Sequence, residues 1–309
     1  MRKCYRLKNF NRSSLLVIQQ ANEILEDYTN QGYVLTLRQL YYQFVARDLL
    51  PNLQKSYKRL GKIVNDARVA GLIDWDYLED RTRNLQRMPH WNDPGHIIES
   101  SALGYHIDKW IGQTYRPEVW IEKDALAGII EGPCEKNDVP YFSVRGYNSQ
   151  SEMHGAAMRL RRWRDVSGQT PVIIHLGDHD PSGIHMTQDI IDRMEMFIGG
   201  VEVRRIALNM NQVDQYNPPP NYAKESDARF RGYVQEFGTE SCWELDALEP
   251  RVLEDLVTDE INSLRDQTPW DDLVAKEERH KSLLAQVSER WDDVIAFLGE
   301  DEDEDFIDE

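Results

Sequence analysis

The sequence predicts an α/β protein in which a helical N-terminal domain precedes a parallel-sheet domain and a helical extension follows it. Three patterns carry this prediction. Amphipathic runs fill residues 1–90, short apolar runs alternate with helical ones over residues 118–215, and helical runs return over residues 216–299. Alternating strands and helices are typical of a parallel sheet with helices on its faces. A chain of 309 residues is long enough for two domains.

Two amphipathic helices open the N-terminal domain. The first is expected over residues 12–28. The second begins at Thr36, which has capping-box spacing with Gln39. Tyr42 is about 100° around this helix from its buried stripe and one turn from Arg38. A large aromatic ring off the buried stripe and beside a guanidinium makes Tyr42 and Arg38 candidate functional residues; packing between domains is the alternative. The stripe itself consists of Leu37, Leu40, Tyr41, Phe44 and Val45.

A third helix, expected over residues 56–70, is rich in basic side chains. Residues 71–82 could then form a short β-wing. Three helices with a basic last one suggest a winged helix-turn-helix domain whose third helix reads the major groove of DNA. The alternative is that these side chains are simply solvated. The candidate DNA-binding residues here are Lys55, Lys58, Arg59, Lys62 and Arg68.

The elements of the central domain, residues 118–215, follow in the order β-α-β-α-β-α-β. Strands are expected at 118–124, 140–146, 172–176 and 201–208, and helices at 125–132, 149–165 and 184–198. A Rossmann-like parallel sheet is the fold that this order favours.

Acidic residues end two of these strands. Asp178 and Asp180 follow the apolar run 172–176, and side chains two apart on an extended chain point the same way. Glu122 ends the first strand. Because open α/β sheets bind ligands at the carboxyl ends of their strands, these three acids predict a Mg²⁺ site. An Asp-rich turn after a buried strand is the alternative. Lys123, beside Glu122, and Arg145 are candidate phosphate contacts.

The charge distribution suits DNA binding by the first domain. The chain has a net charge of −18, yet residues 1–90 hold 15 basic and 9 acidic residues. Three scattered cysteines indicate neither a disulfide framework nor a zinc site. With no apolar run of about 20 residues and no apolar signal core, the sequence predicts a cytoplasmic protein that does not contact membranes.

The remaining segments carry weaker signals. Residues 91–117 are expected to be a connector, residues 243–257 and 271–299 to be helical, and the acidic tail 300–309 to be disordered. Glu244 and Asp246 could supply an outer acid to the metal site.

Two groups of residues resemble a known family. Glu122 and the run Asp178-x-Asp180-Pro-x-Gly183 resemble a Toprim domain. The run from Thr36 to Tyr42, TLRQLYY, resembles the T-x-R-[DE]-[LI]-[FY]-Y motif of the topoisomerase VI A subunit and its meiotic double-strand-break relatives, which join a winged helix to a Toprim domain. Gln39 stands where that family has an acid. The stretch 221–248 is similar to one in compact phage and mobile-element relatives, and to one in Toprim nucleases of bacterial plasmid defence.

This resemblance implies a reaction and its partners. Tyr42 would attack double-stranded DNA, supported by Arg38, to form a 5′-phosphotyrosyl double-strand break. Glu122, Asp178 and Asp180 would hold Mg²⁺, with Mn²⁺ as a substitute. A homodimer is implied, in which Tyr42 of one chain works with the acids of the other, and a separate B-type ATPase subunit is a further expected partner. The alternatives are a hydrolytic Toprim nuclease with a structural Tyr42 and a protein that binds DNA without cutting it. Expected settings are the nucleoid or a phage-infected bacterial cell.

Overall fold

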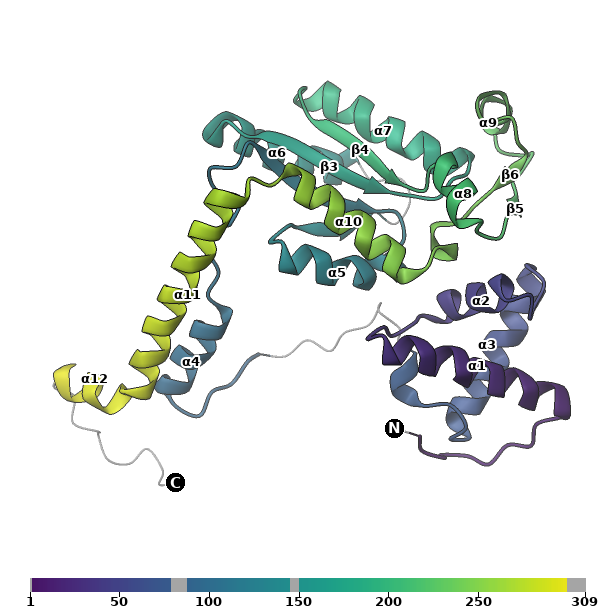
Figure 1. The fold of residues 1–309 in the computed structure, drawn as a ribbon, viewed down its shortest axis with the longest axis horizontal. Helices are drawn as coiled ribbons and strands as arrows, with labels where there is room; N and C mark the ends of the chain where they lie inside the picture. The colour runs from purple at the N-terminus through teal and green to yellow at the C-terminus, as the bar shows by residue number, and fades with distance from the viewer. Residues whose placement is uncertain (1, 79–87, 145–149, 299–309) are drawn as a thin grey trace. The chain divides into compact units, whose positions relative to one another are not determined.

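A computed structural model describes residues 2–78, 88–144 and 150–298 (Figure 1). These residues form two compact units. The first unit contains the described residues up to 78 together with residues 114–264, and the second contains residues 88–113 and 265–298. Arg145 and the acidic tail 300–309 lie outside the described residues. In the described part of the chain, no helix is long and apolar enough to cross a membrane.

Three helices open the first unit: α1 (Arg12–Asn30), α2 (Leu37–Ala46) and α3 (Gln54–Val69). The predicted capping box at the start of α2 is confirmed. Thr36 Oγ1 accepts a hydrogen bond from Gln39 N at 3.3 Å, and Gln39 Oε1 accepts one from Thr36 N at 2.7 Å. These two bonds satisfy backbone donors that a helix start leaves without partners.

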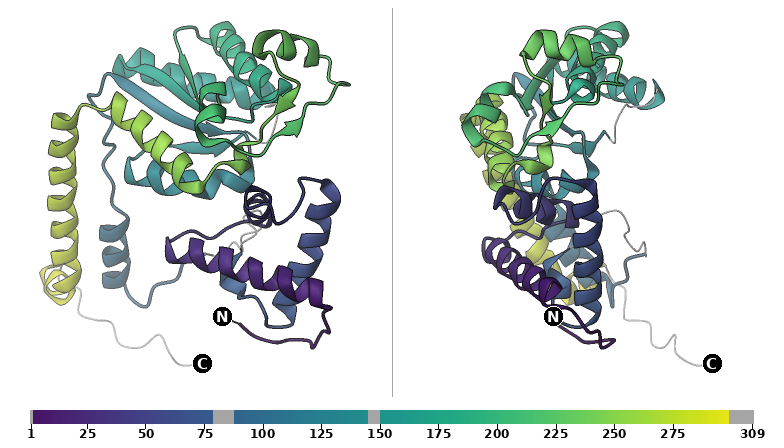
Figure 2. Two further views of the ribbon diagram at one scale, coloured as in Figure 1. Left: turned by 45° about the vertical axis from the view of Figure 1, so that its right-hand side comes forward. Right: turned by 90° about the vertical axis from the view of Figure 1, so that its right-hand side faces the viewer.

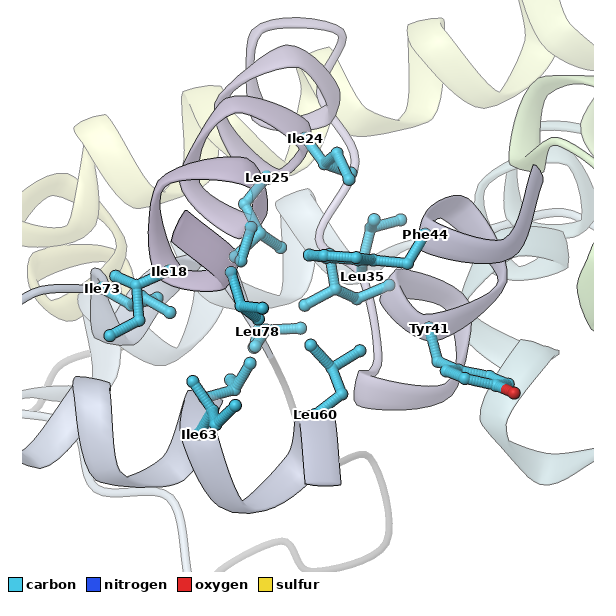
Figure 3. Close-up of a cluster of buried hydrophobic side chains, with 14 of the residues drawn as sticks. Ile18, Ile24, Leu25, Leu35, Tyr41, Phe44, Leu60, Ile63, Ile73 and Leu78 are labelled. Carbon is cyan, nitrogen blue, oxygen red and sulfur yellow. The ribbon is translucent and has the colours of Figure 1, made fainter. Parts of the chain in front are cut away.

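One apolar core joins α1, α2 and α3 (Figure 3). Leu40, Phe44 and Leu60 are fully enclosed in it. The expectation that Tyr42 lies off the buried surface was wrong, because its side chain is only 3% exposed. The helix periodicity is correct, but the chain that follows residue 240 covers the second face of α2, and sequence spacing within α2 carries no information on that contact.

The segment after α3 is compact. Trp75–Tyr77 forms a 3₁₀ helix, and Leu78 makes a parallel β-bridge with Leu35. Residues 79–82, the second half of the expected wing, lie outside the described residues, so the wing stays a prediction.

Four parallel strands form the sheet of the first unit, in the order β2-β1-β3-β4. They are β1 (Tyr115–Ile121), β2 (Tyr141–Ser143), β3 (Thr170–Leu176) and β4 (Glu202–Ala207). The last six residues of β1 and of β3 are buried on both faces of the sheet, as parallel sheets require. The predicted α/β class is confirmed.

Helices cover both faces of this sheet (Figure 2). On one face, α6 (Gln150–Ser167) and α7 (Pro181–Phe197) pack on Trp120 and Ile173. On the other, α5 (Ala127–Lys136), which follows the 3₁₀ helix Asp124–Leu126, packs against α10 (Pro250–Leu264).

Between β4 and α10 the chain makes short elements beside the sheet. These are α8 (Met210–Tyr216), α9 (Phe230–Phe237), the antiparallel pair β5 (Asn221–Tyr222) and β6 (Ser241–Cys242), and the 3₁₀ helix Leu245–Ala247. The expected helix over 243–257 was wrong at its start, since the α-helix begins only at Pro250. Proline favours the first turn of a helix, where its missing N–H breaks no hydrogen bond.

The second unit is helical. It contains α4 (Pro94–Gly104), α11 (Gln267–Glu289) and α12 (Trp291–Leu298). The single helix expected over 271–299 was wrong, because the chain leaves the helical conformation at Arg290. Asp292 and Asp293 then lie in the first turn of α12, where the helix dipole favours negative charge.

A buried carboxylate organises this second unit. Glu277 of α11 accepts hydrogen bonds from Ile107 N at 2.8 Å, Lys109 Nζ at 2.8 Å and Lys281 Nζ at 2.9 Å. Burial opposes ionisation of Glu277, but these donors outweigh it and lower its pKa to about 2. The segment before the sheet is thereby fastened to α11.

Candidate functional site

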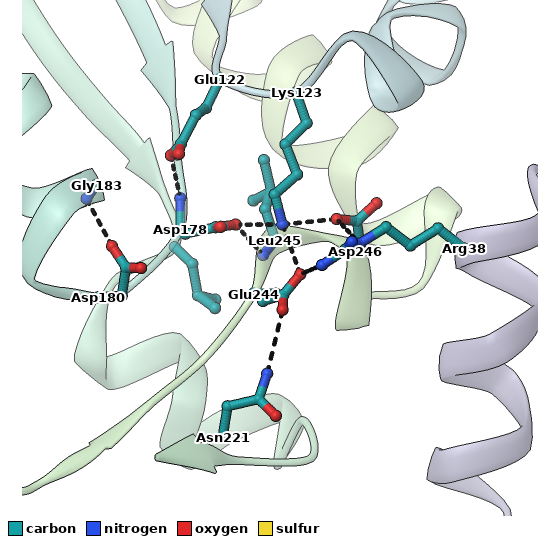
Figure 4. Close-up of polar contacts among 12 residues, drawn as sticks. Arg38, Glu122, Lys123, Asp178, Asp180, Gly183, Asn221, Glu244, Leu245 and Asp246 are labelled. Atoms are coloured by element: carbon teal, nitrogen blue, oxygen red, sulfur yellow. Dashed lines mark hydrogen bonds and ion pairs between the residues drawn. The ribbon is translucent and has the colours of Figure 1, made fainter. Parts of the chain in front are cut away.

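The three predicted acids follow two neighbouring strands at the carboxyl edge of the sheet (Figure 4). Strands β1 and β3 are neighbours with Ile121 opposite Leu176, so the residues that follow both strands emerge together. Glu122 follows β1 directly, and its N–H donates to Leu176 O at 2.8 Å. Asp178 and Asp180 follow β3 after one glycine. The parallel register, which the sequence pattern predicted, is what brings these acids together.

Each acid is oriented by a backbone N–H group. Glu122 Oε2 accepts from Asp178 N at 2.8 Å, and Asp180 Oδ1 accepts from Gly183 N at 2.6 Å, which caps α7. Asp178 Oδ1 accepts from Leu245 N at 2.7 Å.

Two glycines let the backbone pass close to these acids. A Cβ at Gly183 would lie 2.2 Å from Asp178 O, and a Cβ at Gly177 would lie 2.9 Å from Glu122 Oε2. Gly183 therefore requires glycine for reasons of space, because the obstacle is backbone, whereas a Cβ at Gly177 would displace the end of the Glu122 side chain. Gly183 is the last residue of the Asp178-x-Asp180-Pro-x-Gly183 run, and its close approach to the backbone explains the glycine in that run.

Sequence reasoning missed Arg205, which supports the acidic loop from β4. Its guanidinium donates to Asp178 O at 2.6 Å, Gly177 O at 2.9 Å and Gly183 O at 3.1 Å. Burial lowers the pKa of Arg205 to about 10, although the nearby acids oppose this shift. The sequence signal for this role is the pair Arg204 and Arg205 inside a strand, since a buried charge needs partners.

The chain after residue 240 adds two more acids to the site. Trp243 pairs with His179 through backbone hydrogen bonds of 2.8 Å and 2.9 Å, which places the following residues beside Asp178. His179 is buried, and its Nδ1 lies 2.8 Å from Tyr233 Oη. Glu244 and Asp246 are the acids brought in.

Lys123 lies at the centre of these acids. Its ammonium nitrogen is 2.6 Å from Asp246 Oδ2, 2.8 Å from Glu244 Oε2 and 2.9 Å from Asp178 Oδ1. Arg38 of α2 hydrogen-bonds to Glu244, and its Nε lies 3.3 Å from Asp246 Oδ2 (Figure 4). One network of charges therefore joins the helix carrying Arg38 to the acidic edge of the sheet.

The pKa values follow from burial and charge. Burial raises the pKa of Asp178 to about 7, with Glu122 adding to the shift and Lys123 opposing it. Burial also raises the pKa of Glu122. For Glu244, burial acts in the same direction, but Lys123 and Arg38 outweigh it and lower the pKa to about 2. The positive charges near Asp178 and Glu122 therefore do not offset the effect of burial on their pKa values, whereas those near Glu244 do.

The donor set suits a hard divalent cation. When all five carboxylates (Glu122, Asp178, Asp180, Glu244 and Asp246) are ionised, as metal binding requires, they exceed the three nearby cations (Lys123, Arg38 and Arg205) by two negative charges. Among the described residues, no three such side chains are already gathered around one point as metal ligands. All donors are nevertheless carboxylate oxygens, the ligands that Mg²⁺ and Mn²⁺ prefer.

Tyr42 lies beside Arg38, which belongs to this network. Arg38 Cζ is 5.8 Å from the centroid of its ring. Burial raises the pKa of Tyr42, and the negative charge of Glu244 raises it further, whereas the positive charge of Arg38 opposes the shift. The structure therefore brings Arg38 and Tyr42 together with the acids, in a state where the tyrosine is protonated and enclosed.

The predicted DNA contacts differ in their surroundings. Lys55, Lys58, Arg59 and Lys62 are exposed on α3. Arg68, by contrast, donates to Trp75 O at 2.8 Å and Leu78 O at 3.0 Å. Lys123 is held by carboxylates as described, and Arg145 lies outside the described residues.

No protein-family model matches this chain, and a search of curated proteins found none with significant similarity to it. Its functional assignment accordingly rests on the residues themselves.

Proposed function

We propose that this protein is a Mg²⁺-dependent DNA-cleaving enzyme that resembles the topoisomerase VI A subunit and acts by transesterification through Tyr42. The observation that carries the proposal is the charge network that connects Arg38, beside Tyr42, to Lys123 and Asp178. The reaction needs a tyrosine, a supporting arginine and metal-binding acids, and the contacts from Arg38 to Glu244 and Asp246 and from Lys123 to Asp178 support the proposal.

The reaction exchanges one phosphoester bond for another. The Tyr42 hydroxyl would lose its proton as its oxygen bonds to a DNA phosphorus, while the bond from phosphorus to the 3′ oxygen breaks and that oxygen gains a proton. The products are a 5′-phosphotyrosyl end and a free 3′-hydroxyl, with no net gain or loss of protons. A divalent ion on Glu122, Asp178 and Asp180 would supply Lewis-acid stabilisation of the phosphate charge. Arg38, whose guanidinium stays charged, would stabilise the same developing charge and the deprotonated tyrosine.

A second function is favoured by one observation. Tyr42 is 3% exposed and its pKa is raised, so attack by its oxygen requires α2 to move from its contact with Glu244. In a hydrolytic Toprim-type nuclease, water attacks the phosphate and Tyr42 serves only in packing. This reaction does not require α2 to move.

The test uses purified protein, supercoiled plasmid and Mg²⁺ or Mn²⁺, stopped with detergent and divided into protease-treated and untreated halves. Transesterification predicts linear DNA that enters the gel only after protease treatment, and loss of cleavage in Tyr42→Phe. Tyr41→Phe is the matched control, since Tyr41 is the neighbouring buried tyrosine and its hydroxyl bonds to residues 51–53 of the same domain. Linear DNA that runs identically in both halves would establish hydrolysis, and no cleavage at all would favour a DNA-binding protein.

Mixed chains test the proposed homodimer. If Tyr42 works with the acids of the partner chain, as the family resemblance implies, a dimer of one Tyr42→Phe chain and one Asp178→Ala chain keeps one intact site and nicks DNA. If Tyr42 works with the acids of its own chain, both sites of that dimer are inactive. Adding a B-type ATPase subunit then tests whether breaks are resealed.

A further inference from the structure

Lys123 is fully engaged by the acidic site. An ammonium group has three N–H donors. In this chain, three different carboxylates lie within 2.9 Å of Lys123 Nζ, at 2.6, 2.8 and 2.9 Å. The Lys123 side chain is 19% exposed and that of Asp246 is 0% exposed, so water contributes little to either charge.

The carboxylates around Lys123 are buried charges that need a nearby cation. Asp246 has one oxygen on Lys123, and its Oδ1 is buried with no hydrogen-bond partner among the described residues. Taking a charge out of water is costly unless an opposite charge replaces the hydration. Asp178 shares one oxygen, Oδ1, between Lys123 and Leu245 N. Its contacts with these two residues leave the other carboxylate oxygen for a metal ion.

We propose that Lys123 is a built-in second cation of this site. Its ammonium group occupies the position between Asp178, Glu244 and Asp246 that a second metal ion would otherwise take, so the chain binds one divalent ion and not the two that many phosphoryl-transfer sites use. Glu244 and Asp246 are the residues that position Lys123. This inference rests on the metal-binding part of the proposed function and is independent of the Tyr42 chemistry.

Charge explains why one ion suffices. The five carboxylates exceed Lys123, Arg38 and Arg205 by two charges, which a single divalent cation balances. Replacing Lys123 by a neutral side chain raises the excess to three and vacates a position surrounded by three carboxylates. A second ion would then be favoured at that position.

The experiment counts Mn²⁺ ions bound to the full chain without DNA, from the electron paramagnetic resonance signal of the free ion. The wild-type chain should bind one ion, and Lys123→Met should bind two. Lys123→Arg, which keeps the charge, should return to one. Lys136→Met is the control, because Lys136 is an exposed lysine at the end of α5.

Each outcome is decisive. Two ions on the wild-type chain, or one on a folded Lys123→Met chain, would overturn the proposal. If Lys123→Met is unfolded without metal, millimolar Mn²⁺ should restore its circular dichroism spectrum with two ions bound, because metal binding to the folded state stabilises it; failure to restore it would also count against the proposal. No Mn²⁺ on the wild-type chain would instead refute the metal dependence of the proposed function, whereas DNA left uncut by a chain that binds one ion would refute only cleavage.

Discussion

Gly183→Ala tests whether the acidic loop is packed as tightly as the structure indicates. The new Cβ would lie 2.2 Å from the Asp178 carbonyl oxygen, whereas real Cβ atoms essentially never approach another atom closer than 3.0 Å. The obstacle is backbone, so no side-chain rotation relieves it. Arg205 also holds that oxygen, with a hydrogen bond of 2.6 Å. The loop or the start of α7 must therefore shift.

The expected magnitude comes from two opposing effects. Glycine to alanine inside a helix normally stabilises a protein by about 0.5–1 kcal/mol. Forcing an atom into a packed site costs about 1–3 kcal/mol, and more where the neighbour cannot move. Because the obstacle is a hydrogen-bonded backbone carbonyl, we expect a net destabilisation of about 2 kcal/mol.

Gly155→Ala is the matched control. Gly155 is an exposed glycine inside α6, and its Cβ would meet no atom within 4 Å. Urea titrations followed by circular dichroism should show a lower transition midpoint for Gly183→Ala and an unchanged or higher one for Gly155→Ala. Equal midpoints for the two variants would refute the packing of the acidic loop described above.

Three further predictions address other parts of the molecule. Alanine at Lys58, Arg59 and Lys62 together should weaken DNA binding and reduce the slope of its log–log salt dependence by about 0.9 for each DNA phosphate that is no longer neutralised, measured by fluorescence anisotropy; an unchanged slope would place α3 outside the interface. Since the pKa of Glu277 is lowered to about 2, its stabilising effect is complete above its unfolded pKa of about 4.3 and is lost as the pH falls towards 2. Acid unfolding of Glu277→Gln should therefore lack this contribution, and an unchanged pH profile would contradict it. Gly177→Ala, which presses on the flexible end of Glu122, should weaken Mn²⁺ binding about tenfold in calorimetry with a smaller effect on stability than Gly183→Ala.

The parts of the site that follow strands of the sheet could be predicted from the sequence. Apolar runs identify β1 and β3, and parallel pairing brings their ends to one edge whatever the rest of the chain does. Glu122, Asp178 and Asp180 were found in this way. The capping box at Thr36 is equally local, because its two hydrogen bonds involve residues three apart.

The parts that depend on contacts distant in sequence could be predicted only weakly or not at all. Glu244 and Asp246 were candidates for an outer acid, but their place beside Asp178 depends on the pairing of Trp243 with His179, which joins segments about sixty residues apart without a hydrophobic repeat to mark it. Burial of Tyr42 has the same origin. Likewise, α4 was expected to be part of a connector, yet it packs on α11, more than 160 residues later.

Glu244 is the residue on which both halves of the candidate site depend. It accepts hydrogen bonds from Lys123 at 2.8 Å and from Arg38, and its negative charge raises the pKa of Tyr42. Glu244 therefore helps to keep the tyrosine neutral, and the same carboxylate holds Lys123, which also contacts Asp178. Because Arg38 and Tyr42 lie on the same helix, we expect any movement of α2 that exposes Tyr42 to break the hydrogen bond from Arg38 to Glu244. Glu244 also holds Lys123, so this movement would alter the charges around Asp178. If the protein cleaves DNA as proposed, a DNA phosphate would favour the movement by competing for Arg38.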